Sequence, residues 1–389
     1  MRPQARTFDV LCRIVASPSA ETVVDLDVHQ LDAVVELAAH HRVTGSVVVA
    51  LRNAGRELPE PLVRLDQEVV VNHLLSLAAM DRAGRALDAA GIRWAVVKGP
   101  AIVPFWAHAP SARSYHDLDL LVDPEVLRDA VHALQSVGFD HRNHNWDGFR
   151  ALGVGEIPLD DGEVVLDLHW SLLGLAEQRQ AVHLPTGPLL DRAAPVRLGG
   201  VEAQTLDVAD ALVHVGVHHA LAGARTLVQL MDVRLLWDAA DRTTARARLR
   251  AAGATRLVAA VLDRARRVFE PGSAPATSSS IADGTPSDLV WVGLNRAVDR
   301  AWQVTHESAP TPFPGGLIGA GRADAGASAR ALWTSLDTWA RSRLGARTVV
   351  SEDGQLDWTV EAGGVESYER FLDDVASGRF TTGRPLSRR

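Results

Sequence analysis

The chain has 389 residues, 47% of them hydrophobic, and a formal net charge of -8. This length allows two or three domains with real cores, and the acidic balance gives no sign of general DNA binding. Its single cysteine, Cys12, excludes an internal disulfide framework or a Cys-based zinc site. Because it shows neither a secretory signal nor a run of about 18 apolar residues, we expect a cytoplasmic protein that does not span a membrane.

The front of the chain is helical by its pattern. Apolar residues recur at three- and four-residue spacing over residues 7–85. Gly91 then marks a helix end before a predicted strand at 92–98. The adjacent histidines His40 and His41 are interpreted as surface or packing residues.

The predicted strand ends in Lys98-Gly99-Pro100, and Lys98 is the only lysine in the chain. A lysine kept among so many arginines indicates a position that needs a compact ammonium group rather than a planar guanidinium. Its chance survival at a strand end is the alternative. Proline is favoured at a first helical position, so a short helix is predicted at 100–107.

Two aspartates begin the next predicted strand, at 117–122. Asp117 and Asp119 are two residues apart and therefore project from the same face, about 6–7 Å apart along the chain. Their charges would repel strongly in a dry setting, so the pair needs a cation. The alternatives are a solvated strand end or ion pairs with arginines. Asp123 is predicted to cap the helix that follows, which ends at Gly138.

A third strand is predicted at 163–170, after a turn-rich stretch from 141 to 162. Its alternation places Asp167 and His169 on the face opposite its leucines. A carboxylate on the inward face of a buried strand is unfavourable unless it is paired or binds a ligand. Asp167 is therefore the natural third acid of a site.

Helical periodicity returns over residues 205–270. His214 and His218 are four residues apart, which is also a zinc-ligand spacing, but no metalloprotease motif accompanies them, so we interpret them as core or substrate-facing residues. Asp232 either faces a cleft or caps a neighbour. Beyond 270, two Pro/Ser/Gly-rich stretches separate predicted helices, and a short hairpin and one last helix close the chain.

These patterns divide the chain into four regions. They are an N-terminal helical region at 1–90, a catalytic core at 91–200 and a helical region packed on that core at 201–270. A linker with a mostly helical C-terminal part follows at 271–389.

Three motifs in order carry a resemblance to a known family. A strand ends in KG, a second strand reads DLDLLV with Arg113 just before it, and a later strand reads VLDLHW. The chain resembles the bacterial uncharacterised nucleotidyltransferases, a group of the superfamily that shares the fold of DNA polymerase beta. The resemblance covers roughly residues 30–240.

That resemblance implies an α+β fold: a small mixed sheet with helices, flanked by N-terminal and C-terminal helical regions. It implies that Asp117, Asp119 and Asp167 bind two Mg²⁺ ions. In the implied reaction an acceptor hydroxyl or amine attacks the α-phosphorus of a nucleoside triphosphate such as ATP, and pyrophosphate leaves. The acceptor is open: a small molecule, a peptide, a protein or tRNA.

The turn after the first strand departs from the Gly-Ser of better-known relatives, so phosphate handling must differ. Four residues are the predicted nucleotide-binding set: Lys98, Gly99, Arg113 and Ser114. Three more are candidates to face the substrate: His169, His218 and Asp232. Two alternative functions stay open. One is an inactive, nucleotide- or partner-binding regulatory module of the same fold. The other is a metal-dependent glycosyltransferase with a D-x-D motif, which would need a doubly wound sheet.

Overall fold

A computed structural model describes residues 3–106, 113–270 and 362–380 of the chain. The predicted linkers, the hairpin and all the predicted C-terminal helices except the last lie outside the described residues. No helix in the described ranges is long and apolar enough to cross a membrane.

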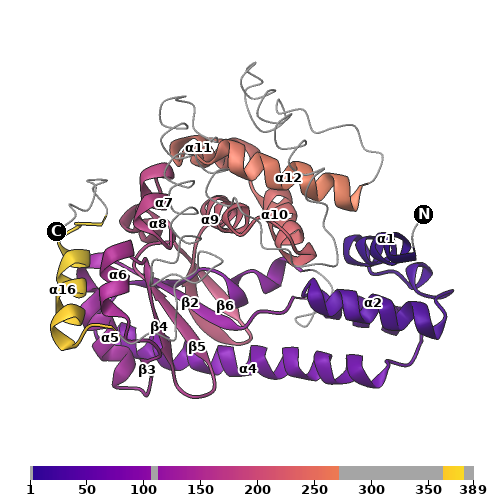
Figure 1. Cartoon of the computed structure of the whole chain (residues 1–389), viewed down its shortest axis with the longest axis horizontal. Helices are drawn as coiled ribbons and strands as arrows, with labels where there is room; N and C mark the ends of the chain where they lie inside the picture. The colour runs from indigo at the N-terminus through magenta and orange to yellow at the C-terminus, as the bar shows by residue number, and fades with distance from the viewer. Residues whose placement is uncertain (1–2, 107–112, 271–361, 381–389) are drawn as a thin grey trace, which may run out of the picture.

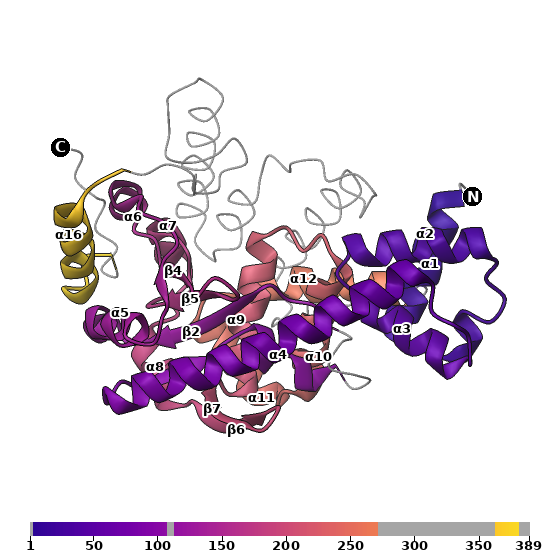
Figure 2. The same cartoon turned by 90° about the horizontal axis from the view of Figure 1, so that it is seen from below.

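The helices predicted for the front of the chain are confirmed. The first four are α1 (Pro3–Ala16), α2 (Val28–His40), α3 (Thr44–Asn53) and α4 (Glu60–Ala89). A capping box begins α2, in which Asp27 accepts a hydrogen bond from the backbone of Gln30 and Gln30 accepts one in return. Figure 2 shows α4 running from these N-terminal helices along the whole sheet.

The predicted α+β class with a mixed sheet is confirmed. The strands are β1 (Trp94–Val96), β2 (Asp117–Val122), β3 (Asp140–His141), β4 (Glu156–Asp160), β5 (Val165–His169), β6 (Ala194–Leu198) and β7 (Val201–Thr205). Their spatial order is β3-β4-β5-β2-β1-β7-β6. The central strand β2 is antiparallel to β1 and parallel to β5, which places the two acidic strands side by side.

Side chains that alternate along the central strands pack into two separate hydrophobic cores, one on each face of the sheet. On β2, Leu118 and Leu120 pack into a core with α4 and with α5 (Leu127–Gln135), whereas Leu121 packs into the core on the other face. That second core contains residues of the N-terminal helices and of α8 to α12, which lie across the sheet from α4 in Figure 1. Asp117 and Asp119 share the face of Leu121.

The remaining described helices lie between the later strands in the chain or after the last strand, and several of them cover the sheet. They are α6 (Trp146–Leu152), α7 (Ala176–Ala181), α8 (Thr186–Asp191), α9 (Val208–Leu221), α10 (Leu227–Ala239), α11 (Arg242–Ala251), α12 (Thr255–Phe269) and α16 (Val365–Ala376). The stretch predicted as turn-rich, 141–162, was therefore wrong in part, because it contains α6 and β4. Pro158 inside β4 is the reason, since proline argues against a strand in sequence.

Two local predictions near the site were also wrong. Residues Gly99–Ala101 and Val103–Phe105 form separate 3₁₀ turns instead of the predicted α-helix, since Pro104 lacks the amide that a longer helix needs. Asp123 makes no capping hydrogen bond; its carboxylate pairs with Arg93 at 2.8 Å. A 3₁₀ turn at Pro124–Val126 precedes α5, which ends at Gln135, before Gly138.

The last predicted helix is present as α16 and docks against α5 and α6 (Figure 1). Its Phe371 is fully buried and packs edge-on against Phe149. Arg128 of α5 forms ion pairs with Glu369 and Asp373 of α16. The helix α16, which follows α5 and α6 by more than 200 residues in the chain, thus completes the hydrophobic core to which these helices belong.

A half-buried histidine makes this docking sensitive to pH. The ring of His141 packs against Trp146 and Tyr368, both with ring centroids 5.0 Å away. Burial, assisted by the charge of His144, lowers the pKa of His141 from its ordinary value of 6.5 to about 4. The unfolded chain therefore takes up this proton first, and stability falls as pH drops from about 7 towards 4.

We expect the His141→Phe variant to lose this pH dependence. Allowing for the partial exposure of the ring, its free energy of unfolding should fall by about 1 kcal/mol less than that of the wild type between pH 7 and pH 5. Urea unfolding at the two pH values measures the difference. His29→Phe, at an exposed position on α2, is the matched control, and equal pH slopes in all three proteins would contradict the prediction.

Candidate functional site

The single lysine of the chain is paired with the second of the two aspartates. Lys98 Nζ lies 2.6 Å from Asp119 Oδ1, and the exposed fractions of the two side chains are 13% and 1%. Burial alone would lower the pKa of Lys98, but the charges of Asp119 and Asp117 raise it above its ordinary value. The ammonium therefore stays charged at the end of β1.

The third predicted acid lies at the level of the second. Asp119 of β2 and Asp167 of β5 are direct partners in the parallel register, so their side chains leave the same face of neighbouring strands. Carboxylate and imidazole atoms of Asp119, Asp167 and His169 lie within 4.8 Å of one another. The structure thus brings two of the three predicted metal ligands together, with a histidine beside them.

His169 connects Asp119 to a fourth acid. Its Nε2 lies 2.8 Å from Asp119 Oδ1, and its Nδ1 lies 3.1 Å from Glu156 Oε2. Burial opposes a charge on the ring, but Glu156 and Asp119 together raise the pKa of His169 above its ordinary value. His169 therefore lies between two carboxylates: it is hydrogen-bonded to Asp119 and lies at ion-pair distance from Glu156.

Asp117, the first aspartate of the motif, is half-buried at the start of β2. Repulsion by Asp119, with some help from burial, raises the pKa of Asp117. Burial and the charge of Glu156 raise the pKa of Asp167 well above its ordinary value. The opposite holds for Asp119: although burial opposes its charge, Lys98 and His169 hold its pKa well below the ordinary value.

The donor set fits a divalent cation. Asp119 Oδ2 is buried and has no hydrogen-bond partner among the described residues, and an unpaired buried carboxylate oxygen is strongly unfavourable. It faces the same side of the sheet as Asp167. Hard oxygen ligands of this kind suit Mg²⁺, so a cation there would satisfy the oxygen and relieve the repulsion among the acids.

Gly99 is required by the turn that follows Lys98. Its φ of +45° lies in the left-handed region, and a Cβ atom there would lie 3.1 Å from the carbonyl oxygen of Asp117 and 3.2 Å from the ring of Tyr115. The close approach is thus to the start of β2.

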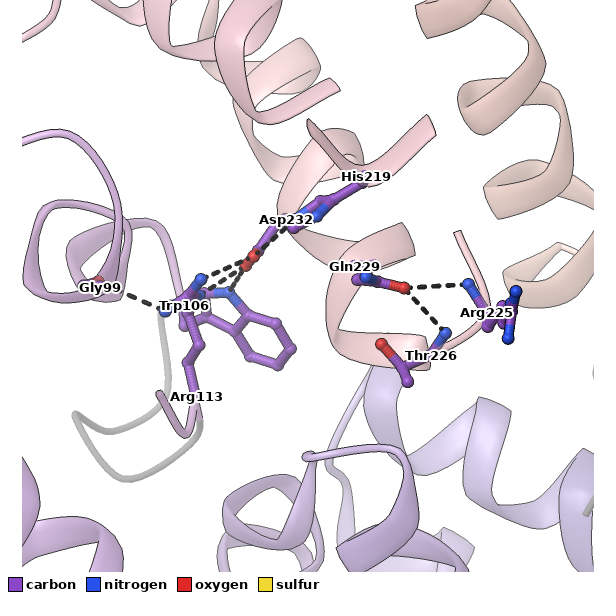
Figure 3. A network of polar contacts seen from close by, with 8 residues as sticks. All are labelled: Gly99, Trp106, Arg113, His219, Arg225, Thr226, Gln229 and Asp232. Carbon is purple, nitrogen blue, oxygen red and sulfur yellow. Dashed lines mark hydrogen bonds and ion pairs between the residues drawn. The ribbon is translucent and has the colours of Figure 1, made fainter. Parts of the chain in front are cut away.

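A buried network behind this turn fixes it to the helical region (Figure 3). Arg113 donates to both oxygens of Asp232, at 2.8 and 2.9 Å, and to the carbonyl oxygen of Gly99 at 3.3 Å. Trp106 Nε1 donates to Asp232 Oδ1 at 2.8 Å, and His219 Nε2 lies 3.3 Å from Oδ2. Burial alone would raise the pKa of Asp232, but Arg113 and His219 lower it to about 2.

The helix that carries Asp232 is itself fixed at its start. Gln229 Oε1 accepts hydrogen bonds from the backbone amides of Arg225 and Thr226, at 2.9 and 3.2 Å, on the other side of Figure 3. These amides would otherwise lack partners at the beginning of α10. Asp232 is thereby presented to Arg113 from a well-anchored helix.

This geometry bears on three predicted residues. The guanidinium of Arg113 is committed to Asp232, and we leave Arg113 out of the nucleotide-binding set. The hydroxyl of Ser114 donates to the carbonyl oxygen of Arg42 at 3.3 Å, so we leave Ser114 out as well. Asp232 neither faces a substrate nor caps a helix; it is the counter-ion of Arg113.

Two histidines of α9 lie near the acidic cluster. His214 is buried, whereas His218 is exposed on the same helix. The charge of Lys98 lowers the pKa of His218 well below its ordinary value, and burial does the same for His214 with a contribution from Lys98. Both imidazoles are therefore neutral, and the assignment of His218 as a substrate-facing residue stays a prediction.

Glu156 is the site residue that sequence reasoning missed. It belongs to β4 and is the register partner of His169. The alternation of Glu156–Asp160, followed by Asp161-Gly162, is a hairpin signal that could have found it. Pro158 in the middle of the segment hides that signal.

Taken together, the mixed sheet and its acids define an α+β protein with a buried acidic cluster suited to a divalent cation. The chain belongs to the uncharacterised nucleotidyltransferase family, whose family model matches residues 27–270, more than half of the chain. No curated protein and no solved structure matches the chain.

We expect Asp232→Asn to destabilise the protein by about 3–5 kcal/mol, because Arg113 would be left buried without its counter-ion. Urea unfolding at pH 7 measures the change. Asp238→Asn, at an exposed ion pair on the same helix, is the matched control and should change stability by less than about 1 kcal/mol. The double variant Arg113→Met/Asp232→Leu should recover most of the loss, and a single variant as stable as wild type would refute the assignment.

Proposed function

We propose that this chain transfers a nucleoside monophosphate from a nucleoside triphosphate to an acceptor hydroxyl or amine. The observation that carries the proposal is the buried, unpartnered oxygen of Asp119 beside Asp167, in a chain of the nucleotidyltransferase family. A bond forms between the acceptor atom and the α-phosphorus, the bond to the bridging oxygen breaks, and pyrophosphate leaves.

The residues have separate parts in this proposal. Asp119 and Asp167 would hold Mg²⁺, with Asp117, on the same face of β2, adding negative charge beside it. The ion, when bound, supplies electrophilic activation of the phosphate and neutralises charge on the attacking and leaving oxygens. Asp167 is only half-buried, in contrast to Asp119, and we assign it as the acid that takes the proton of the acceptor. Lys98 keeps Asp119 ionised and adds positive charge where a triphosphate would bind.

The same ion pair favours one alternative, a nucleotide-binding module without catalysis. An ammonium group beside Asp119 could attract a triphosphate with no ion bound. Binding of a triphosphate without pyrophosphate release would identify this case. The glycosyltransferase alternative is not supported, because the sheet is mixed and not doubly wound and the family is one of nucleotidyltransferases.

The test is incubation with each of the four labelled ribonucleoside triphosphates and Mg²⁺. We expect pyrophosphate release with at least one of them, with label transferred to the chain itself, to RNA or to a small-molecule pool. The absence of release in the presence of every acceptor class would reject the transfer reaction. The destination of the label identifies the acceptor.

We expect Asp117→Asn combined with Asp119→Asn to lower pyrophosphate release by at least about 100-fold, since the charge that would hold the cation is lost. Circular dichroism and thermal unfolding establish that the variant is folded. Asp129→Asn, at an exposed aspartate of α5, is the control and should keep full activity. Undiminished release in the double variant would exclude a mechanism that depends on these carboxylates.

A further inference from the structure

The two oxygens of Asp119 have different surroundings. Oδ1 is shared by two donors, Lys98 Nζ at 2.6 Å and His169 Nε2 at 2.8 Å. Oδ2 is buried and has no partner among the described residues. One oxygen is therefore engaged by protein groups, and the other has no protein partner among the described residues.

A pair of divalent ions about 3.5–4 Å apart is normally held by ligands between them. A carboxylate that bridges the two ions needs both of its oxygens. Mg²⁺ binds oxygen at about 2.0–2.1 Å, so an ion on Asp119 Oδ1 would compete for space and charge with the ammonium 2.6 Å from that oxygen.

The backbone holds the ammonium in this position. Lys98 follows β1, whose end is tied to β2 by the hydrogen bond from the amide of Val97 to the carbonyl of Asp119, at 3.1 Å. Gly99 is packed against the start of β2 and accepts a hydrogen bond from Arg113. With 13% of its side chain exposed, Lys98 has little room to move away from Asp119.

One ion pair of the chain shows what an arginine can do to a buried aspartate. At Asp232, Arg113 occupies both carboxylate oxygens with Nε and Nη2, at 2.8 and 2.9 Å. A guanidinium forms such forked pairs, whereas an ammonium acts as a point charge. At Asp119 the lysine occupies one oxygen and leaves the other available.

We propose that Lys98 takes the place of a second metal ion, so that the acidic cluster itself holds a single divalent ion, bound by Asp119 Oδ2 and Asp167. This assignment deepens the proposed function and rests on its cation-binding step. It replaces the two protein-held ions that the family resemblance implies. The ammonium of Lys98 supplies the fixed positive charge on the Oδ1 side.

The experiment counts bound ions in the full-length protein without nucleotide. Mn²⁺ is the probe, and the electron paramagnetic resonance signal of the free ion gives the number bound. Ions that disappear in the Asp119→Asn variant are assigned to the cluster; Asp129→Asn corrects for surface carboxylates. We expect one cluster ion in the wild type and two in Lys98→Met, because removal of the ammonium frees Oδ1.

Lys98→Arg provides a second, opposite readout. If its guanidinium engages both oxygens of Asp119, as Arg113 does at Asp232, the cluster should bind no ion. A wild-type count of zero or two, a count of one in a folded Lys98→Met, or a retained ion in Lys98→Arg would overturn the assignment. Should Lys98→Met not fold, the wild type and Lys98→Arg still decide it.

The count is independent of the proposed reaction. One cluster ion in the wild type without pyrophosphate release from any triphosphate would remove the proposed transfer and support the role of Lys98. Pyrophosphate release by a wild type that holds two cluster ions would support the transfer and overturn the role of Lys98.

Discussion

Repulsion among four clustered carboxylates, one fully buried and three half-buried, is the constraint on which the rest of this structure depends. Asp117, Asp119, Asp167 and Glu156 come from three neighbouring strands and share one face of the sheet. Like charges and burial disfavour ionisation, and the pKa values of Asp117 and Asp167 are raised, whereas that of Asp119 is lowered. Lys98 and His169 make that possible, because both approach the same oxygen of Asp119. Asp119 is therefore the acid of the cluster whose charge the protein itself stabilises.

The buried ion pair between Arg113 and Asp232 holds the elements that carry this cluster in place. Arg113 lies four residues before Asp117 and holds both the turn at Gly99 and the helix that carries Asp232. The strand that presents the acids and the turn that presents Lys98 are thus joined to α10 through one guanidinium. Removing either partner of a buried ion pair is strongly destabilising. We therefore regard this network as the part of the fold that keeps the site in register.

The sequence was informative where a signal is local. Period-two alternation predicts that Asp117 and Asp119 share one face and that Asp167 lies on a second acidic strand. The register of β2 and β5, in which Asp119 is paired with Asp167, agrees with this. Partners distant in sequence were not accessible in this way: Arg113 and Asp232 are separated by 119 residues, and no pattern connects them. The 3₁₀ turns after Gly99 are harder to predict, because Pro100 suits a helix start whereas Pro104 prevents that helix from continuing.

The solitary lysine follows from the same reasoning about geometry. The chain otherwise uses arginine for every long cation, and it has a lysine where, in our proposal, the ion pair leaves a carboxylate oxygen for a ligand. An arginine that formed the forked pair found at Asp232 would close that oxygen to any ligand. A neutral residue would leave Asp119 buried among three other acids with much less compensation. The compact ammonium satisfies both requirements, since it neutralises charge at one oxygen and preserves the ligand at the other.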